Sequence, residues 1–267
     1  MEKNQGQFNY KRITTFITAS YTISWLIWLP NVISSNFNFD WGNSNLLHLI
    51  GGLGPLFAAI ITTIIYSKKR GLSEYFKHKF LNFSDPKWIF IAFLIPTGFF
   101  LIAFLITGVI FGEWTDPDLI GINSKIPFEN KLLIWLSWIF FYGIGEESGW
   151  RGFLFPELMK KFNMRTSALY TALIWGGWHL PIFFYDNNFQ AVGLMGLLGW
   201  LIGLIFGSFI LSWLTVNAEW NLWPAILWHA AFNFFTAGDK ISPLYPALTT
   251  MMVIIFGLWL SRKYKLE

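Results

Sequence analysis

The chain has 267 residues, of which 54% are hydrophobic and 13% are charged, about half the charged share of an ordinary soluble protein. It contains no cysteine, which excludes disulfides, thiolate metal ligands and a cysteine nucleophile. The net charge of +4 does not indicate nucleic-acid binding, because the distribution of the basic residues along the chain fits membrane orientation instead. No nucleic-acid partner is expected.

Runs of about 18 or more nearly uncharged residues recur along the chain, and such a run can cross a bilayer core of about 30 Å as a helix. No segment alternates with the period of two that a barrel strand requires. The sequence therefore predicts an all-α polytopic membrane protein with about eight transmembrane helices. No repeat or soluble domain interrupts them, so residues 1–267 are expected to form a single membrane domain. The predicted spans are 13–34, 46–66, 88–111, 131–152, 167–185, 191–215, 222–238 and 244–261.

The basic residues are distributed unevenly between the two sides of these spans. With a cytoplasmic N-terminus, fifteen of the 19 Lys and Arg residues fall in inner segments and three fall in outer loops. This asymmetry follows the positive-inside rule, so both termini are predicted to be cytoplasmic and the lipid bilayer is a partner. A composition rich in Ile, Phe, Asn and Lys is typical of a low-GC bacterium, and the expected location is a bacterial plasma membrane.

The fourth span carries the first ionisable cluster, "GEESGWR", which contains Glu146, Glu147 and Arg151. Ionisable residues inside a span are costly and usually mark function. Glu147 and Arg151 are four residues apart, so they share a helix face and can pair. Glu146 points about 100° away from Glu147 and faces a different neighbour. A purely structural ion pair near the cytoplasmic end of the helix, with Glu146 reaching toward water, is the alternative.

The fifth and seventh spans each contribute a histidine. His179 follows a Gly pair, which permits close helix approach, and precedes Pro181, which loosens the backbone hydrogen-bond ladder. By these boundaries His179 lies deeper than Glu146. His229 and Asn233 are four apart and share one face of the seventh span. The alternatives are a core histidine that donates to a carbonyl, and an asparagine that links two helices.

Buried polar groups need partners, so the polar residues of these three spans are expected to meet at one buried site. A carboxylate can be the general base for water, and His and Asn can stabilise an oxyanion. A Glu with two His is also a plausible zinc ligand set, so the residues leave a divalent metal open. Ser148 is a weak candidate nucleophile, because "GEESG" is one residue longer than the GxSG pattern. The chain contains no HExxH motif and no pair of Asp residues inside spans.

These motifs resemble those of the CAAX-protease and bacteriocin-processing family of intramembrane endopeptidases (CPBP, also called ABI), which includes the Ras-converting CAAX endopeptidase. "EESGWR" is similar to the family's EExxxR motif, and His179 matches the histidine of FxxxH, with Trp175 in place of the Phe. "HAAFN" is similar to the HxxxN-type motif at His229 and Asn233. The resemblance covers about residues 130–240, the expected catalytic core.

The resemblance implies a glutamic-type endopeptidase, with metal dependence left open, that hydrolyses a peptide bond of a membrane peptide or protein. Glu146 would activate water with help from His179, and His229 and Asn233 would form the oxyanion site. Arg151 would pair with Glu147 to hold the motif. One alternative is a non-proteolytic protein on the same scaffold that acts in bacteriocin immunity or regulation by binding a partner. Another is a transporter with a proton relay, although no repeat symmetry supports it.

Overall fold

All regular elements among the residues that the structure describes are helices, as the sequence predicts. The structure is a computed structural model, and it describes residues 7–37, 44–82, 85–191 and 193–263. The α-helices are α1 (Tyr10–Phe37), α2 (Ser44–Gly51), α3 (Gly54–Phe76), α4 (Lys87–Phe111), α5 (Lys131–Ser137), α6 (Gly145–Gly149), α7 (Phe155–Met159), α8 (Met164–Trp178), α9 (Asn187–Ala191), α10 (Gly193–Asn217), α11 (Trp223–Thr236) and α12 (Leu244–Lys263). Short π-helical turns cover Lys77–Leu81, Trp138–Ile144 and Trp150–Leu154, and 3-10 turns cover Pro117–Leu119 and Leu180–Phe184.

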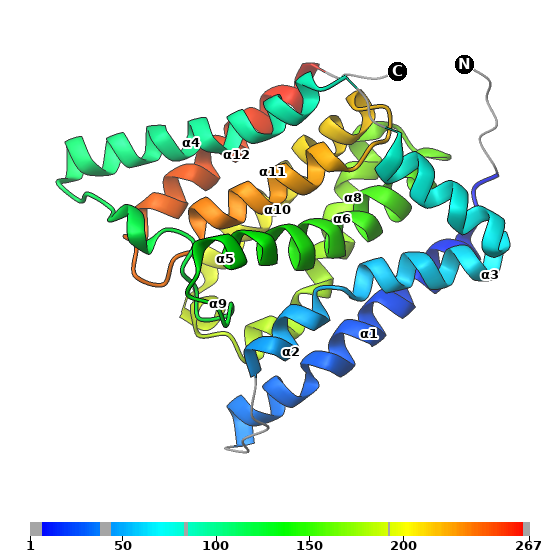
Figure 1. Cartoon of the computed structure of the whole chain (residues 1–267), viewed down its shortest axis with the longest axis horizontal. Coiled ribbons are helices and arrows are strands. Elements are labelled where there is room, and N and C mark those ends of the chain that lie inside the picture. The colour runs from blue at the N-terminus through cyan, green and yellow to red at the C-terminus, as the bar shows by residue number, and fades with distance from the viewer. Residues whose placement is uncertain (1–6, 38–43, 83–84, 192, 264–267) are drawn as a thin grey trace.

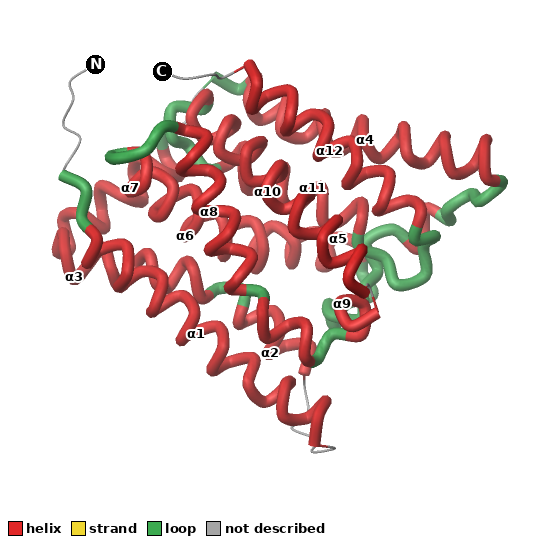
Figure 2. Tube along the Cα trace, turned by 180° about the vertical axis from the view of Figure 1, so that it is seen from behind, coloured by secondary structure: helices red, strands yellow, loops and turns green. Residues whose placement is uncertain are grey.

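Five helical segments in the described part of the chain are long and apolar enough to cross a membrane: α1, the tract 45–81 that contains α2 and α3, α4, α10 and α12. The bounds of α1, α4, α10 and α12 agree with the predicted spans to within three residues. Figure 2 shows the start of α1 and the end of α12 at the same end of the bundle. The chain is therefore an integral membrane protein with several apolar helices.

The other three predicted spans are helical but differ from simple membrane-crossing helices. Helices α8 and α11 have 15 and 14 residues. At 1.5 Å per residue they are about 21–22 Å long, which is less than a bilayer core of about 30 Å. The remaining span carries the charged motif and is divided by π-helical turns. The count of eight spans and the cytoplasmic side of both termini therefore stay predictions.

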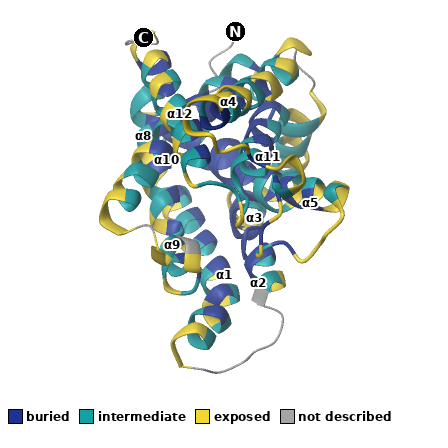
Figure 3. Ribbon diagram, turned by 90° about the vertical axis from the view of Figure 1, so that its left-hand side faces the viewer, coloured by how far each residue is buried: buried dark blue, intermediate teal, exposed yellow. Residues whose placement is uncertain are grey.

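The outer surface of the bundle is strongly apolar. Figure 3 shows the buried positions on the inward faces of the helices and exposed positions on their outward faces. Helix α4 exposes a row of large side chains, namely Phe90, Leu94, Leu101, Leu105 and Val109. An exposed apolar surface of this kind is what lipid-facing helices present.

The charged motif lies at the centre of the bundle. From Lys131 to Met159 the chain follows one continuous helical path, in which the π turns Trp138–Ile144 and Trp150–Leu154 flank α6. Figure 1 shows this path between α1 to α3 on one side and α4, α11 and α12 on the other. Helix α6 packs on α3, and the first π turn packs on α11. Single π turns inside α-helices occur often at functional sites, and here they bracket Glu146.

Helix α8 ends at the second predicted motif. Pro181 disfavours α-helical geometry in the residue before it and cannot itself donate a backbone hydrogen bond. The chain passes from α8 into a 3-10 turn with His179 at the junction. The indole Nε1 of Trp25 in α1 donates to the carbonyl of Trp178 at 3.0 Å. The first helix therefore holds the end of α8, and with it the position of His179.

The close approach of α6 to α3 generates a prediction about Gly149. A Cβ at Gly149 would lie 2.8 Å from the backbone C and O of Pro55, whereas a Cβ at Gly98 in α4 would meet nothing within 4 Å. Overpacking of this kind costs about 1–3 kcal/mol. We expect Gly149→Ala to lower the melting temperature of the detergent-purified protein and Gly98→Ala to leave it unchanged or raise it. Equal melting temperatures for both variants would show that the helices can separate without cost.

Candidate active site

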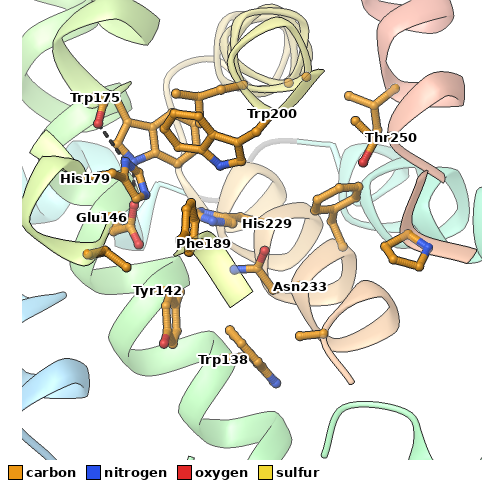
Figure 4. A pocket seen from close by; sticks show the side chains of 18 of the residues that line it. Trp138, Tyr142, Glu146, Trp175, His179, Phe189, Trp200, His229, Asn233 and Thr250 are labelled. Carbon is orange, nitrogen blue, oxygen red and sulfur yellow. Dashed lines mark hydrogen bonds between the residues drawn. The ribbon is translucent and has the colours of Figure 1, made fainter. Parts of the chain in front are cut away.

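The three polar motifs meet at one cavity of about 730 Å³. Four of the six predicted residues line it: Glu146, His179, His229 and Asn233. Glu147 and Arg151 are not among the lining residues and are fully buried behind the wall. Figure 4 shows the four lining side chains around a common space, on the central helical path, at the end of α8 and on α11. The convergence expected from the sequence is therefore present, and His179 shares the cavity despite its deeper predicted position.

Glu146 and Glu147 face different surroundings, as their spacing of one residue predicts. Glu146 is 2% exposed and lines the cavity. Its Oε2 accepts a hydrogen bond of 2.6 Å from the indole Nε1 of Trp175. Its other oxygen remains for a ligand in the cavity.

Glu147 is the centre of a buried polar cluster. Its Oε1 accepts from Arg151 Nη1 at 3.1 Å, which is the i, i+4 pair expected from the sequence. The same oxygen lies 2.7 Å from His229 Nδ1. Both Glu147 and Arg151 have side chains with no exposed area. Among the described residues, Arg151 Nε and Nη2 and Glu147 Oε2 have no hydrogen-bond partner, so the Glu147–Arg151 contact carries most of the compensation for two buried charges.

The hydrogen bonds also fix the imidazole orientations. His179 Nδ1 lies 2.8 Å from the carbonyl oxygen of Trp175, and a carbonyl only accepts, so Nδ1 carries the proton. In the neutral ring Nε2 then has the free lone pair. His229 Nδ1 donates to the carboxylate of Glu147, which leaves its Nε2 for a ligand. Each histidine thus has one nitrogen fixed by the protein and one available for chemistry.

The alternative reading of His179, a core histidine that donates to a carbonyl, also describes its hydrogen bond in the structure. It is a half-buried histidine that donates to a carbonyl, and it is packed against the rings of Trp178 and Trp200 with centroid distances of 4.9 and 5.3 Å. It lines the cavity at the same time. A backbone hydrogen bond therefore orients this histidine without removing it from the site.

Trp175 connects the candidate catalytic residues, a role that the sequence does not predict. Its N–H holds Glu146 and its carbonyl holds His179. Its ring lies 4.5 Å from Arg151 Cζ and makes an edge contact with His229 at a centroid distance of 5.4 Å. The sequence offered one signal, since a buried Trp usually finds a partner for its N–H. A Phe at this position could fill the space but could not donate to Glu146.

Ser148, the weak candidate nucleophile, is turned away from the cavity. It is fully buried, and its Oγ donates to the carbonyl of Ile144 one turn earlier at 2.6 Å. It does not line the cavity. The "GEESG" stretch instead uses its glycines for helix packing, as Gly149 shows.

The metal alternative can be compared with the positions of the candidate ligands. No group of three or more His, Asp and Glu side chains in the described ranges is arranged to hold a metal ion. Oε2 of Glu146 and Nδ1 of each histidine are already hydrogen-bonded, so a metal ion could be held only by the other Glu146 oxygen and the two Nε2 atoms. As they lie, these side chains do not form a ligand set, so no chemical step is assigned to a metal.

Two comparisons with known proteins agree with the motifs. Residues 128–235, which contain all three motifs, match the family described as Type II CAAX prenyl endopeptidase Rce1-like. A protein of Methanococcus maripaludis named CAAX prenyl protease 2 is 21% identical over 226 residues, which cover 82% of this chain and 81% of that protein. Both matches support the resemblance of the motifs to the CAAX-protease (CPBP) family.

Proposed function

We propose that the protein is an intramembrane endopeptidase in which Glu146 activates a water molecule to hydrolyse a peptide bond of a membrane-associated peptide or protein. The matches to a protease family support a peptidase. The observation that carries the proposal is the position of Glu146, a buried carboxylate that faces a cavity shared with two oriented histidines. A buried carboxylate beside such groups is suited to general-base catalysis.

The residues of the cavity take different roles in the hydrolysis. Glu146 takes a proton from water while the lone pair of His179 Nε2 helps to hold that water. The resulting hydroxide attacks the scissile carbonyl, and the oxyanion accepts hydrogen bonds from Asn233 and from His229. The protonated Glu146 then returns its proton to the leaving amine, which completes the cycle.

The role of His229 sets a condition on its protonation. Since Nδ1 donates to Glu147, the ring can donate from Nε2 only as the imidazolium. The carboxylate of Glu147 stabilises this cation, and Arg151 fixes the carboxylate. Glu147 would thus act on His229 as the carboxylate of a hydrolytic triad acts on its histidine, by orienting the ring and stabilising its cation.

The substrate class follows from the location and from the relative. The name of the Methanococcus maripaludis protein makes a prenylated tail one candidate, and a small membrane peptide such as a bacteriocin precursor is the other. We favour the small membrane peptide, because the composition is typical of a bacterium, where CAAX prenylation is not expected.

Glu146→Gln tests the proposed function directly. Loss of a general base lowers turnover by about 10²- to 10⁴-fold, and we expect the variant to insert in the membrane like the wild type. Comparative membrane peptidomics of wild-type and Glu146→Gln cells then reveals the peptide that only the wild type processes. The matched control is Glu129→Gln, which changes an exposed carboxylate in the loop that precedes α5.

The immunity alternative makes the opposite prediction for the same strains. A protein that acts only by binding a partner keeps its cellular function in the Glu146→Gln variant. Identical peptidomes in the two strains, with full protection by the variant, would rule out proteolysis as the function.

Trp175→Phe tests the hydrogen bond to Glu146. A hydrogen bond to a charged group contributes about 1.5–3 kcal/mol, so we expect kcat to fall by about 10- to 100-fold with little change in KM. Trp223→Phe is the control, because Trp223 does not line the cavity and its indole donates to the carbonyl of Phe80 at 3.1 Å. If the Trp175 variant keeps the wild-type kcat, the bond has no role in positioning Glu146.

Chelation tests the metal-free chemistry. We expect EDTA and 1,10-phenanthroline to leave the activity of the purified protein unchanged, and elemental analysis to find no stoichiometric zinc. Inactivation by chelator that added zinc reverses would establish a metal-bound water in place of Glu146-activated water.

A further inference from the structure

A third histidine, His48, belongs to the wall of the cavity. It lies in α2, outside the residues 128–235 that match the endopeptidase family. Helix α2 packs on α1 and on the π turn Trp138–Ile144 of the central helical path. The proposed hydrolysis does not use this histidine, although an ionisable residue inside a membrane-spanning tract usually marks function.

Neighbours from three different elements hold His48 in place. Its ring is stacked on Trp28 of α1, with centroids 6.0 Å apart and an interplanar angle of 23°, and Trp28 Nε1 donates to its main-chain carbonyl at 3.0 Å. The ring of Tyr142, which Figure 4 shows on the same helix as Glu146, lies 6.2 Å away between centroids. His48 Nδ1 is 2.6 Å from the hydroxyl of Tyr185, which ends the 3-10 turn after α8. The orientation of the imidazole is therefore fixed.

The length of the bond between Tyr185 and His48 indicates which atom donates. The distance of 2.6 Å is shorter than the about 2.7–3.2 Å of an N–H donor to oxygen and falls in the about 2.5–3.0 Å of a hydroxyl donor. Tyr185 therefore donates to Nδ1, and in the neutral ring of His48 the proton is then on Nε2. His179 has the opposite tautomer, because its Nδ1 donates to a carbonyl. The cavity thus contains one histidine with a lone pair at Nε2 and one with an N–H there.

Nε2 of His48 is open to the cavity. It makes no hydrogen bond within the described part of the chain. It is also not sealed by surrounding atoms, as Nε1 of Trp138 and the hydroxyl of Tyr142 are. His48 is 5% exposed, and the space that it borders is the cavity. Its N–H is therefore a donor that a ligand in the cavity can use.

A peptide in this cavity needs such a donor. Its main-chain carbonyls lose their hydrogen bonds to water on entry, and each carbonyl without a new partner opposes binding. Two other polar side chains of the wall are already paired, since Lys125 Nζ lies 2.8 Å from Asp186 and the amide of Asn123 donates to Asp239 at 2.9 Å. The N–H of His48 has no competing acceptor of this kind.

We propose that His48 is a substrate-binding residue, which donates a hydrogen bond from Nε2 to a main-chain carbonyl of the bound peptide other than the scissile carbonyl. The scissile carbonyl has its own donors in Asn233 and His229, so the bond from His48 is equally strong before and during the chemical step. Uniform binding of this kind lowers KM and leaves kcat unchanged. The proposal rests on the proposed peptidase function, and it gives α1 and α2 a part in binding the substrate.

The test uses three variants of His48 and an internally quenched peptide copied from the processing site found by peptidomics. His48→Phe keeps a ring and removes the donor, so we expect KM to rise by about 2- to 10-fold, the range of one hydrogen bond, with kcat unchanged. His48→Gln places an amide N–H near the position of Nε2 and restores KM. The amide of His48→Asn is too short to reach that position, and KM stays raised.

Two further measurements do not depend on cleavage. In the Glu146→Gln protein, fluorescence anisotropy shows weaker binding of the same peptide after His48→Phe, by the same factor as the change in KM. Nitrogen-15 NMR of the histidine-labelled protein shows the proton of His48 on Nε2 and that of His179 on Nδ1. His78→Phe is the matched control, because His78 is exposed and does not line the cavity, and it leaves KM and the binding affinity unchanged.

A histidine with only a structural role gives a different result. Its variants melt at a lower temperature, but the folded protein keeps the wild-type KM, and the Gln and Asn variants do not differ. A wild-type KM in folded His48→Phe, equal KM values for His48→Gln and His48→Asn, or a proton on Nδ1 of His48 overturns the proposal. Cleavage by Glu146→Gln at the wild-type rate instead overturns the proposed function, so the two failures are distinguishable.

Discussion

The shared oxygen of Glu147 is the contact on which the arrangement of the site depends. A carboxylate and a guanidinium without exposed area are stable only as a pair, because removal of one partner of a buried ion pair costs about 3–5 kcal/mol. Arg151 lies on the same helical path as Glu147, so this pair stiffens the centre of the bundle. His229 adds a bond from α11, and that bond fixes α11 relative to the charged motif. The Glu147 carboxylate thus joins two helices through one atom.

Because Arg151 pairs with Glu147, Glu146 needs no cation of its own and can have different hydrogen-bond partners. The two carboxylates are adjacent in the sequence, yet one is bound by a cation and an imidazole and the other by an indole N–H. Trp175 adds the third helix to the assembly, since it contacts both the charged motif and His179 from α8. The site is therefore held by side chains from the central helical path, from α8 and the turn that follows it, and from α11.

Much of this arrangement could be predicted from the sequence. The spacing of Glu147 and Arg151 predicts their pair, and the scarcity of polar partners in an apolar chain predicts that the motifs converge. The contact of Glu147 with His229 could not be predicted, because spacing determines which residues share a helix face but not which faces meet. The hydrogen bond from Trp175 to Glu146 could not be predicted for the same reason. Trp175 in place of the motif's Phe adds an N–H donor, but the sequence does not show which group accepts from it.

Some helix bounds could also be predicted from the sequence, and others could not. Long apolar runs predict α1, α4, α10 and α12 closely, because burial in lipid requires their length and composition. The short α8 could not be distinguished from a full span, since the residues that follow it, Leu180–Phe184, are apolar as well. The π-helical turns leave no pattern in composition, because they depend on how the path from Lys131 to Met159 packs against α3 and α11.

Those π turns have a consequence for how this segment can vary. Each accommodates the chain in a wider turn than an α-helix, so the direction of Glu146 depends on the number of residues on either side of it. Removing a single residue from such a turn would rotate everything beyond it by about 100° relative to the other helices. Glu146 would then leave the cavity wall, although every residue of the motif would still be present. In this segment the chain length is under a stricter constraint than the identity of many side chains, and variation by substitution is tolerated where insertion and deletion are not.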